Sequence, residues 1–343
     1  MKDIARETGY SVAAVSLALS GKSSRLSDET KKAILETAGK HGYRHNYLAQ
    51  GLVTKKTKVL GVIVPDVSSS FFARITKGIG FEAEKHGYDI MLVDTGNNPD
   101  KDVMAARTLL ERSVDGILYI YSPSGKRDHA RMCISLCEEE GIPIVLMDRT
   151  PDTQFANVVM LDHELGGYLA GKHLIDLGHR RIGCAANSLV TDPAHLRFEG
   201  YKKALKEAGI KFDKSICLEG GFRGHYENVD TRAGYELAGR LIDKNVTAIF
   251  AFNDITAFGI YRFAREFGLK VPDDFSLIGF DDIYFSEIME VPLTTIRQPS
   301  GSIGIASVKR MMKLLNQDDS IDEGPIILEP KLIVRKSTRG IKA

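Results

Sequence analysis

Apolar positions recur at helical spacing in three short stretches at the start of the chain. The inward faces of the three predicted helices hold Ile4, Ala5 and Thr8; Ala14, Val15, Ala18 and Leu19; and Ile34, Leu35 and Ala38. A glycine-containing break at 9–11 separates the first two helices, a pattern typical of helix-turn-helix DNA-binding modules. Ser11 and Ser27 are placed to cap the second and third helices, and Gly21 to end the second.

From residue 58 the pattern changes to short apolar, β-branched runs that alternate with amphipathic segments. Eight of these runs read as buried strands: 59–64, 89–94, 115–120, 142–148, 181–186, 215–220, 247–252 and 275–281. Strands that alternate with helices predict doubly wound α/β structure with parallel sheets.

Glycines repeat between the two halves of this region. Each member of the first set lies 122 residues before its counterpart: Gly61, Gly78 and Gly87 against Gly183, Gly200 and Gly209. Because the order of elements repeats as well, a duplicated lobe explains the pattern better than chance. Ligands of open α/β sheets bind beyond the carboxyl ends of the strands, so two facing lobes predict a cleft that can close.

Charge is distributed unevenly along the chain. Residues 1–58 carry eleven Lys/Arg and five Asp/Glu, a net of +6, whereas 59–343 carry a net of −5 and the total is +1. A basic head on an acidic body is expected of a phosphate-contacting module joined to a sensor domain. The excess of basic residues, taken alone, is equally consistent with an ordinary solvated basic surface. The helical pattern in the same residues favours DNA binding.

Composition and motifs exclude several classes of protein. No apolar run approaches the ~20 residues of a membrane span, and the start lacks the apolar core of a secretory signal. The segments 21–24 and 163–167 resemble parts of a phosphate loop and a zinc-protease helix, but each lacks an essential residue. We therefore expect that the protein is not an enzyme and that it binds neither a metal ion nor a cofactor. We expect reduced thiols at Cys133, Cys137, Cys184 and Cys217.

Residues 46–58 join head and body. Leu48, Ala49, Leu52 and Val53 share one face of a possible two-turn helix, which would be marginal on its own. The segment is either a flexible tether or a hinge helix that pairs with its twin in a dimer and enters the minor groove.

The loops after the first strand of each lobe are predicted walls of the cleft. They offer Phe71 and Phe72 in 65–75, and Asp192 and Arg197 in 187–197. Three further polar residues end strands of the second lobe: Asn253, Asp254 and Asp281. Aromatic faces with Arg, Asn and Asp groups suit a polyhydroxylated or heterocyclic small molecule. One of the two phenylalanines is expected in the core, and Asp254 has the alternative role of capping the next helix.

Several sequence blocks together resemble the lactose-repressor/galactose-repressor (LacI/GalR) family of bacterial transcription regulators. They include KDIARETG, VSLALSG, HGYRHNYLAQGL, KVLGVIVPDVSSSFFARITKGI, GYLAGKHLIDLGHRRIG and VPDDFSLIGFDD, and they extend over essentially the whole chain. The resemblance implies a headpiece, a hinge helix and a two-lobed core of the type I periplasmic-binding-protein fold. The corresponding boundaries are 1–45, 46–58 and 59–343, with the first lobe about 59–160 and 291–325 and the second about 161–290 and 326–343.

The same resemblance implies a cytoplasmic homodimer that binds a pseudo-palindromic operator under the control of a small effector. A sugar or sugar derivative is the default effector, with a nucleobase as the alternative. The implied DNA-contacting residues are Val12, Ala13, Ser16, Leu17, Asn46, Ala49 and Leu52. The implied effector-contacting residues are Phe71, Phe72, Asp192, Arg197, Phe222, Asn253 and Asp281.

Three features depart from the family pattern. Leu17 replaces the Arg or His of many members, which shifts the expected readout toward thymine methyl groups, phosphates and DNA deformability. The first helix lacks the capping residue that members have upstream, which leaves an incomplete or misassigned start as an alternative. The segment 220–236 is longer than the usual loop.

The competing hypotheses are a solute receptor of the periplasmic type, which the core alone would support, and a sugar-modifying enzyme.

Overall fold

The computed structural model describes residues 1–19, 26–41, 56–122, 128–151, 155–186, 189, 191–220, 231–318 and 324–341. The chain separates into two compact units, Met1–Thr57 and Lys58–Ala343. Each unit is described by itself below.

The first unit contains the three predicted helices, α1 (Lys2–Thr8), α2 (Val12–Leu19) and α3 (Asp28–Lys40). The predicted caps Ser11 and Ser27 are confirmed, since the Ser11 hydroxyl accepts from the Ala14 amide and the Ser27 hydroxyl from the Thr30 amide. Gly21, predicted to end the second helix, lies outside the described residues. The residues that share its small core are Ile4, Ala5, Val15, Ala18, Ile34 and Ala38.

Leu35 is a correction to the predicted core face. Its side chain is 53% exposed, whereas that of Ile34 is fully buried. The buried positions of α3 are Ile34 and Ala38, four residues apart, and Leu35 lies outside that stripe because each residue turns the helix by about 100°.

The second unit contains two six-stranded sheets, and all eight predicted strands are present. The strands of the first sheet are β1 (Val59–Val64), β2 (Asp89–Asp94), β3 (Gly116–Tyr119), β4 (Ile144–Met147), β5 (Val158–Leu161) and β11 (Ile326–Leu328). Those of the second are β6 (Ile182–Ala186), β7 (Cys217–Glu219), β8 (Ala248–Ala251), β9 (Ser276–Asp281), β10 (Thr294–Arg297) and β12 (Lys331–Ile333). The strand orders, β11-β5-β4-β3-β1-β2 and β12-β10-β9-β8-β6-β7, correspond position by position. The described pairings are parallel except for β10 with β12.

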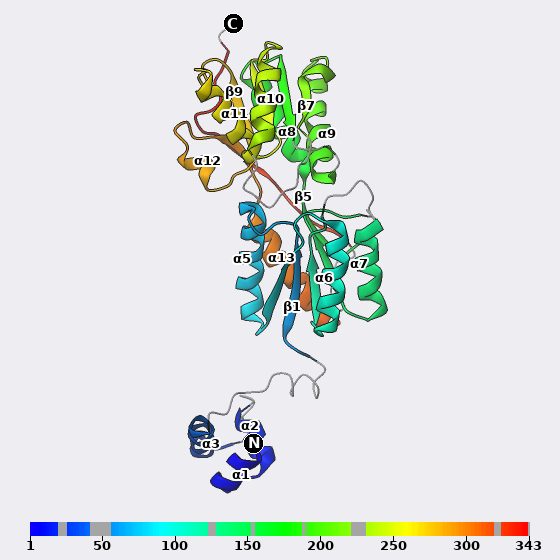
Figure 1. Cartoon of the computed structure of the whole chain (residues 1–343), viewed down its shortest axis with the longest axis vertical. Coiled ribbons are helices and arrows are strands. Elements are labelled where there is room, and N and C mark those ends of the chain that lie inside the picture. Colours follow the sequence, from blue (N-terminus) through cyan, green and yellow to red (C-terminus); the bar gives the residue numbers. More distant parts are fainter. Residues whose placement is uncertain are drawn as a thin grey trace. The chain divides into compact units, whose positions relative to one another are not determined.

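Helices cover both faces of each sheet (Figure 1). In the first lobe these are α5 (Ser70–Lys85) with α13 (Ser300–Leu315) on one face, and α6 (Pro99–Glu111) with α7 (Asp128–Glu139) on the other. In the second lobe they are α8 (His163–Asp176) with α9 (Asp192–Glu207), and α10 (Arg232–Ile242) with α11 (Asp254–Glu266). Two short helices, η1 (Lys214–Ile216) and α12 (Phe285–Ile288), complete the described elements.

The repeated glycines permit the same helix crossing in both lobes. A Cβ atom on Gly78 would lie 2.2 Å from the Gly301 carbonyl oxygen of α13, and one on Gly200 would lie 1.9 Å from the Glu164 oxygen of α8. Both distances are far below van der Waals contact, so only glycine lets α5 meet α13 and α9 meet α8 this closely. The duplication inferred from glycine spacing therefore corresponds to a shared packing requirement.

The crossings between the lobes correct the predicted lobe boundaries. β10 was assigned to the first lobe within 291–325 but pairs with β9 in the second sheet. β11 was assigned to the second lobe within 326–343 but pairs with β5 in the first. Strands of only three or four residues carry too little pattern to show which sheet they join, and pairing with a distant strand decides it.

Among the residues that the structure describes, no helix has the length and apolar character to cross a membrane.

Candidate functional site

The headpiece presents most of the predicted recognition residues on one open face of α2. Val12 is 47% exposed, Ala13 and Ser16 are exposed, and Leu17 is partly buried. Val15 and Ala18, on the opposite face, are buried against α1 and α3. The remaining residues implied for DNA binding, Asn46, Ala49 and Leu52, lie outside the described part of the chain.

Two direct side-chain hydrogen bonds between described residues connect the lobes of the second unit. The Arg74 guanidinium of α5 donates to the Asp282 carbonyl oxygen at 2.9 Å. Tyr121 follows β3, and its hydroxyl donates to the carboxylate of Asp192, the first residue of α9, over 2.8 Å. Asp192 thus lies at the lobe boundary. Phe222 lies in 221–230, outside the described residues.

Arg197 lies in the interior of the second lobe, on α9, and is only 8% exposed. Its Nη1 donates to the Phe252 carbonyl oxygen and its Nε to His163 Nδ1 at 3.3 Å. The guanidinium carbon lies 3.7 Å from the centre of the Phe280 ring, a cation–π contact. Three contacts therefore fix the guanidinium, and its Nη2 points toward Asp281 Oδ1 at 3.9 Å.

Asp281 ends β9 in a conformation that favours glycine, with φ at 121°. It accepts a hydrogen bond from the Gln298 amide nitrogen, and Gln298 Oε1 is buried without a hydrogen-bond partner among the described residues. Burial raises the pKa of Asp281 to about 7, although the nearby Arg197 charge acts to lower it. An aspartate held at such φ costs on the order of 1–3 kcal/mol, and strain of this kind clusters at functional sites.

The structure shows which of Asn253 and Asp254 has the capping role that the sequence offered for Asp254. Asn253, not Asp254, caps α11, because its side-chain oxygen accepts from the Thr256 amide. Asp254 is fully buried and accepts from the Ile283 amide and from the hydroxyls of Ser286 and Thr295. Burial raises the pKa of Asp254 to about 6, against the effect of these bonds. Asp254 thus holds the turn that follows Asp281.

The fold agrees with the comparisons to known proteins. Residues 1–46 match the family described as "Bacterial regulatory proteins, lacI family", and 57–328 match "Periplasmic binding proteins and sugar binding domain of LacI family". The chain belongs to the LacI family. It is a transcription regulator with a helix-turn-helix DNA-binding headpiece and a ligand-binding core of the periplasmic-binding-protein type. Neither the solute-receptor hypothesis nor the enzyme hypothesis is retained, since family members are transcription regulators.

Individual relatives of this LacI-family chain resemble it over nearly its full length. The HTH-type transcriptional regulator DegA of Bacillus subtilis (strain 168) is 34% identical over 340 residues, covering 98% of this chain and 97% of DegA. The Lac repressor dimer bound to operator and the anti-inducer ONPF has a TM-score of 0.85 at 27% identity, covering 98% of each chain. A LacI family regulator from Enterococcus faecium with bound ribose has a TM-score of 0.72 at 30% identity, covering 83% of this chain and 100% of that one.

Sequence reasoning missed the first-lobe half of the candidate site in this LacI-family core. Asp148 directly follows β4, the counterpart of β9, and has φ at 67°. Burial acts to raise the pKa of Asp148, but its contact with His163 and the charge of Arg149 outweigh that effect and hold it at about 2. The signal was an aspartate at the end of a buried strand, the same rule that identified Asp281.

Arg149 is a second missed residue. It is 8% exposed, donates through Nε to Asp148 at 3.3 Å and through Nη1 to the Tyr121 carbonyl oxygen at 3.0 Å. Its guanidinium carbon lies 6.0 Å from the Phe72 ring centre. Phe72 is the phenylalanine buried in the core, and Phe71 is partly buried with its ring edge-on to Phe72. We call Asp148, Arg149, His163, Arg197 and Asp281 the inter-lobe cluster.

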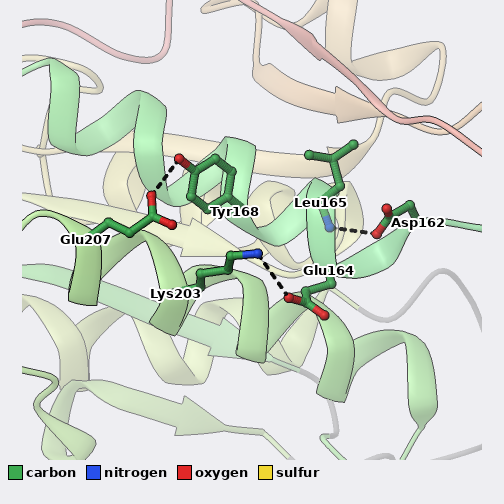
Figure 2. Close-up of a pocket in the computed structure, with 6 residues that line it drawn as sticks. All are labelled: Asp162, Glu164, Leu165, Tyr168, Lys203 and Glu207. Atoms are coloured by element: carbon green, nitrogen blue, oxygen red, sulfur yellow. Dashed lines mark hydrogen bonds and ion pairs between the residues drawn. The ribbon is translucent and has the colours of Figure 1, made fainter.

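A separate hollow of about 410 Å³ lies on the outer surface of the second lobe, between α8 and α9. Figure 2 shows two polar pairs across these helices, Lys203 with Glu164 at 3.6 Å and the Tyr168 hydroxyl with Glu207 at 2.8 Å. None of its lining residues belongs to the inter-lobe cluster. Its polar groups bond to one another, as on an ordinary solvated helix pair. Nor do the described residues include a group of three or more His, Cys, Asp or Glu placed to hold a metal ion.

Proposed function

We propose that this regulator is a cytoplasmic homodimeric repressor whose operator affinity is controlled by a sugar-type effector bound at the inter-lobe cluster. The observation that carries the proposal is the Arg197 guanidinium, fixed on three sides and aimed at Asp281 across a 3.9 Å gap. A ligand hydroxyl there can accept from Arg197 and donate to Asp281 at once.

The pairing of charges supports an uncharged effector. Each buried guanidinium of the inter-lobe cluster already faces a carboxylate, Arg149 with Asp148 and Arg197 with Asp281. An anionic ligand would have to displace one of these carboxylates, whereas sugar hydroxyls or the edge of a nucleobase can bond to both partners. Phe71 and Phe72 offer an apolar wall, and Asp192 and Asn253 lie at neighbouring strand and helix ends.

DNA contact is proposed for the open face of α2, where Val12, Ala13, Ser16 and Leu17 would face the major groove. Since three of these four side chains are apolar, contacts with thymine methyl groups and with DNA shape would contribute more than hydrogen bonds. Asn46, Ala49 and Leu52 of the linker are proposed to reach the minor groove, with Leu52 as the wedge that unstacks the central base step.

The dimer surface is proposed to extend over both lobes. Four large apolar side chains are more than half exposed there, Phe81 on α5 and Tyr284, Phe285 and Ile288 at α12. α5 and the turn before α12 are joined by the Arg74 hydrogen bond to Asp282. Exposed apolar patches of this kind mark association surfaces.

Effector-driven lobe closure would change the spacing of the two linkers in the dimer. A typical coupling free energy of ~1–3 kcal/mol would give roughly 5–150-fold regulation of operator affinity.

The effector site is tested by Arg197→Lys. Lysine keeps the charge but loses the planar fork, so we expect at least a tenfold loss of affinity, about 1.4 kcal/mol, with operator binding retained. Thermal shift with D-ribose, cellobiose and hypoxanthine, followed by calorimetry, measures it. Arg181→Lys is the matched control, since Arg181 is exposed and pairs with Asp213 away from the cluster. An Arg197→Lys protein with unchanged affinity would remove the cluster from consideration.

The DNA interface is tested by Leu52→Ala. Loss of the wedge is expected to weaken binding to a selected operator at least tenfold, about 1.4 kcal/mol, and to reduce DNA bending in a gel-shift assay. Binding to a random duplex at low salt serves as the control, because phosphate contacts do not involve this side chain. Equal operator affinity and equal bend angle for both proteins would defeat the minor-groove assignment.

A further inference from the structure

His163 begins α8 and lies between the two halves of the inter-lobe cluster. The residue is 1% exposed, and its ring packs beside Phe280 with 6.0 Å between ring centres. α8 packs on α9 and on strands of the second sheet, so His163 belongs to the second lobe. Its two ring nitrogens face different partners.

The first ring nitrogen, Nδ1, accepts a hydrogen bond from Arg197 Nε at 3.3 Å. A guanidinium has only donors, so Nδ1 must be unprotonated. Burial lowers the pKa of His163, which keeps the ring neutral. A neutral ring with a bare Nδ1 carries its proton on Nε2.

The second ring nitrogen, Nε2, faces the other lobe. It lies 3.5 Å from Asp148 Oδ1, at the carboxyl end of β4. Both atoms are shielded from solvent, and neither has a hydrogen-bond partner within the described ranges. Since buried donors and acceptors are rarely left unmatched, a small approach of the lobes would complete this bond.

We propose that His163 is a positioning residue that couples effector binding to lobe closure, orienting Arg197 through Nδ1 and engaging Asp148 of the opposite lobe through Nε2–H. The inference rests on the proposed effector site at Arg197. Ligand that draws Arg197 toward itself pulls on Nδ1, and the rigid ring passes the displacement to the contact with Asp148. One side chain thereby joins the effector-binding group to the lobe that must move.

The first test needs no effector. In the full-length protein labelled with ¹⁵N-histidine, the His163 ring is expected to show a protonated Nε2 and an unprotonated Nδ1 from pH 6 to 8. Absence of this signal pair in His163→Asn assigns it. A protonated Nδ1, or an imidazolium in this range, would overturn the inference.

Two variants then separate the two contacts. Asparagine can place its side-chain oxygen near the position of Nδ1 but does not reach Asp148. His163→Asn is therefore expected to keep the Arg197 Nε–H signal protected from solvent exchange. Glutamine places its amide nearer the position of Nε2, so His163→Gln is expected to lose that protection. Equal Arg197 exchange in both variants would count against the proposed geometry.

The coupling is measured with whichever of D-ribose, cellobiose and hypoxanthine raises the wild-type melting temperature most. His163→Asn is expected to retain more probe affinity than His163→Gln, while the probe no longer changes operator affinity. His163→Gln is expected to lose at least tenfold in probe affinity. His173→Asn is the matched control, a half-buried histidine of the same helix that bonds to Thr338, and should change neither quantity.

The outcomes distinguish this inference from the proposed site. A His163→Asn protein that keeps the full operator response would exclude His163 as the coupling residue, whatever Arg197 does. Normal probe affinity in Arg197→Lys would instead show that the effector binds elsewhere. If none of the three probes binds, the protonation state of the His163 ring and the solvent-exchange rate of the Arg197 Nε–H decide whether the inference holds.

Discussion

The two lobes share one scaffold and differ in what they place at its functional edge. Both have the same strand order and the same glycine-mediated helix crossing. At the position of Arg197 in the second lobe, 122 residues earlier, the first lobe has Ile75, which is fully buried in an apolar core. The backbone around the two residues is also alike, since each carbonyl oxygen touches a glycine of the partner helix, Gly304 for Ile75 and Gly167 for Arg197.

A second equivalent pair differs in electrostatics. Asp148 and Asp281 end corresponding strands, and both have positive φ. Yet the pKa of Asp148 is held at about 2, and that of Asp281 is raised to about 7. The difference shows that packing constrains the shared scaffold, whereas the side chains placed on it determine the charge state. Lobe duplication therefore need not duplicate a binding site.

The largest expected effect concerns what the lobes share. Gly78→Ala and Gly200→Ala should each destabilise the core by about 3 kcal/mol, because the new methyl group meets a backbone oxygen that cannot rotate away. Denaturant unfolding followed by circular dichroism measures this loss. Gly80→Ala is the control on the same helix, where the nearest atom is Ile90 Cδ1 at 3.9 Å. That variant should gain up to about 1 kcal/mol from helix propensity.

Unequal losses would break the scaffold comparison. If Gly78→Ala were tolerated and Gly200→Ala were not, the two crossings would differ in their freedom to separate. The glycine repeat would then reflect ancestry without a current packing requirement in the first lobe.

The next effect concerns how the lobes differ. The folded-state pKa of Asp148 lies below the unfolded value of about 3.8, so its stabilising contribution is present above pH 4 and is lost as the pH falls through about 2. A shift of roughly two units corresponds to about 2–3 kcal/mol. The folded-state pKa of Asp281 lies above its unfolded value, so its contribution is present below pH 4 and is lost as the pH rises through about 7.

Asparagine at each position should therefore change the pH profile of the melting temperature in opposite senses. Relative to wild type, Asp148→Asn should be less stable at pH 5 and approach it near pH 2. The melting temperature of Asp281→Asn should rise relative to that of wild type as the pH increases from 4 to 7.5. If both variants moved the same way, the electrostatic contrast between the lobes would not hold.

Local pattern predicted more of the fold than of the site. Eight strands were found because each is a buried apolar run between turn signals, and three headpiece helices because their caps and faces agree. β5, β10, β11 and β12 were missed because each is only three or four residues long and lacks the longer predicted run of six or seven residues that contains the short strands β3, β4, β7 and β8. Their sheet membership depends on pairing partners distant in the sequence.

The candidate site shows the same contrast between features that are visible in the local sequence and features that depend on tertiary contacts. Arg197 and Asp281 were predicted because a loop after a strand and a polar strand end are visible locally. Asp148 obeys the same rule and could have been found. His163 could not, since the role proposed for it arises only when the chain passes from β5 of the first lobe to α8 of the second and brings the His163 ring between Arg197 and Asp148.

The smallest expected effect returns to the shared scaffold at its helix ends. Gly87 and Gly209 follow α5 and α9 with φ at 67° and 68°, and a methyl group added at either position would have no other atom within 4 Å. Alanine should therefore cost only the backbone penalty, about 1 kcal/mol in each lobe, because L-residues disfavour the left-handed region. Asparagine, which tolerates that region, should recover part of the loss. Calorimetric melting of the four variants checks this, and a gap larger than about 0.5 kcal/mol between the lobes would exceed what independent sites normally show. Such a gap would mean that one helix end is held by more than its own backbone, so the lobes would differ in scaffold as well as in charge.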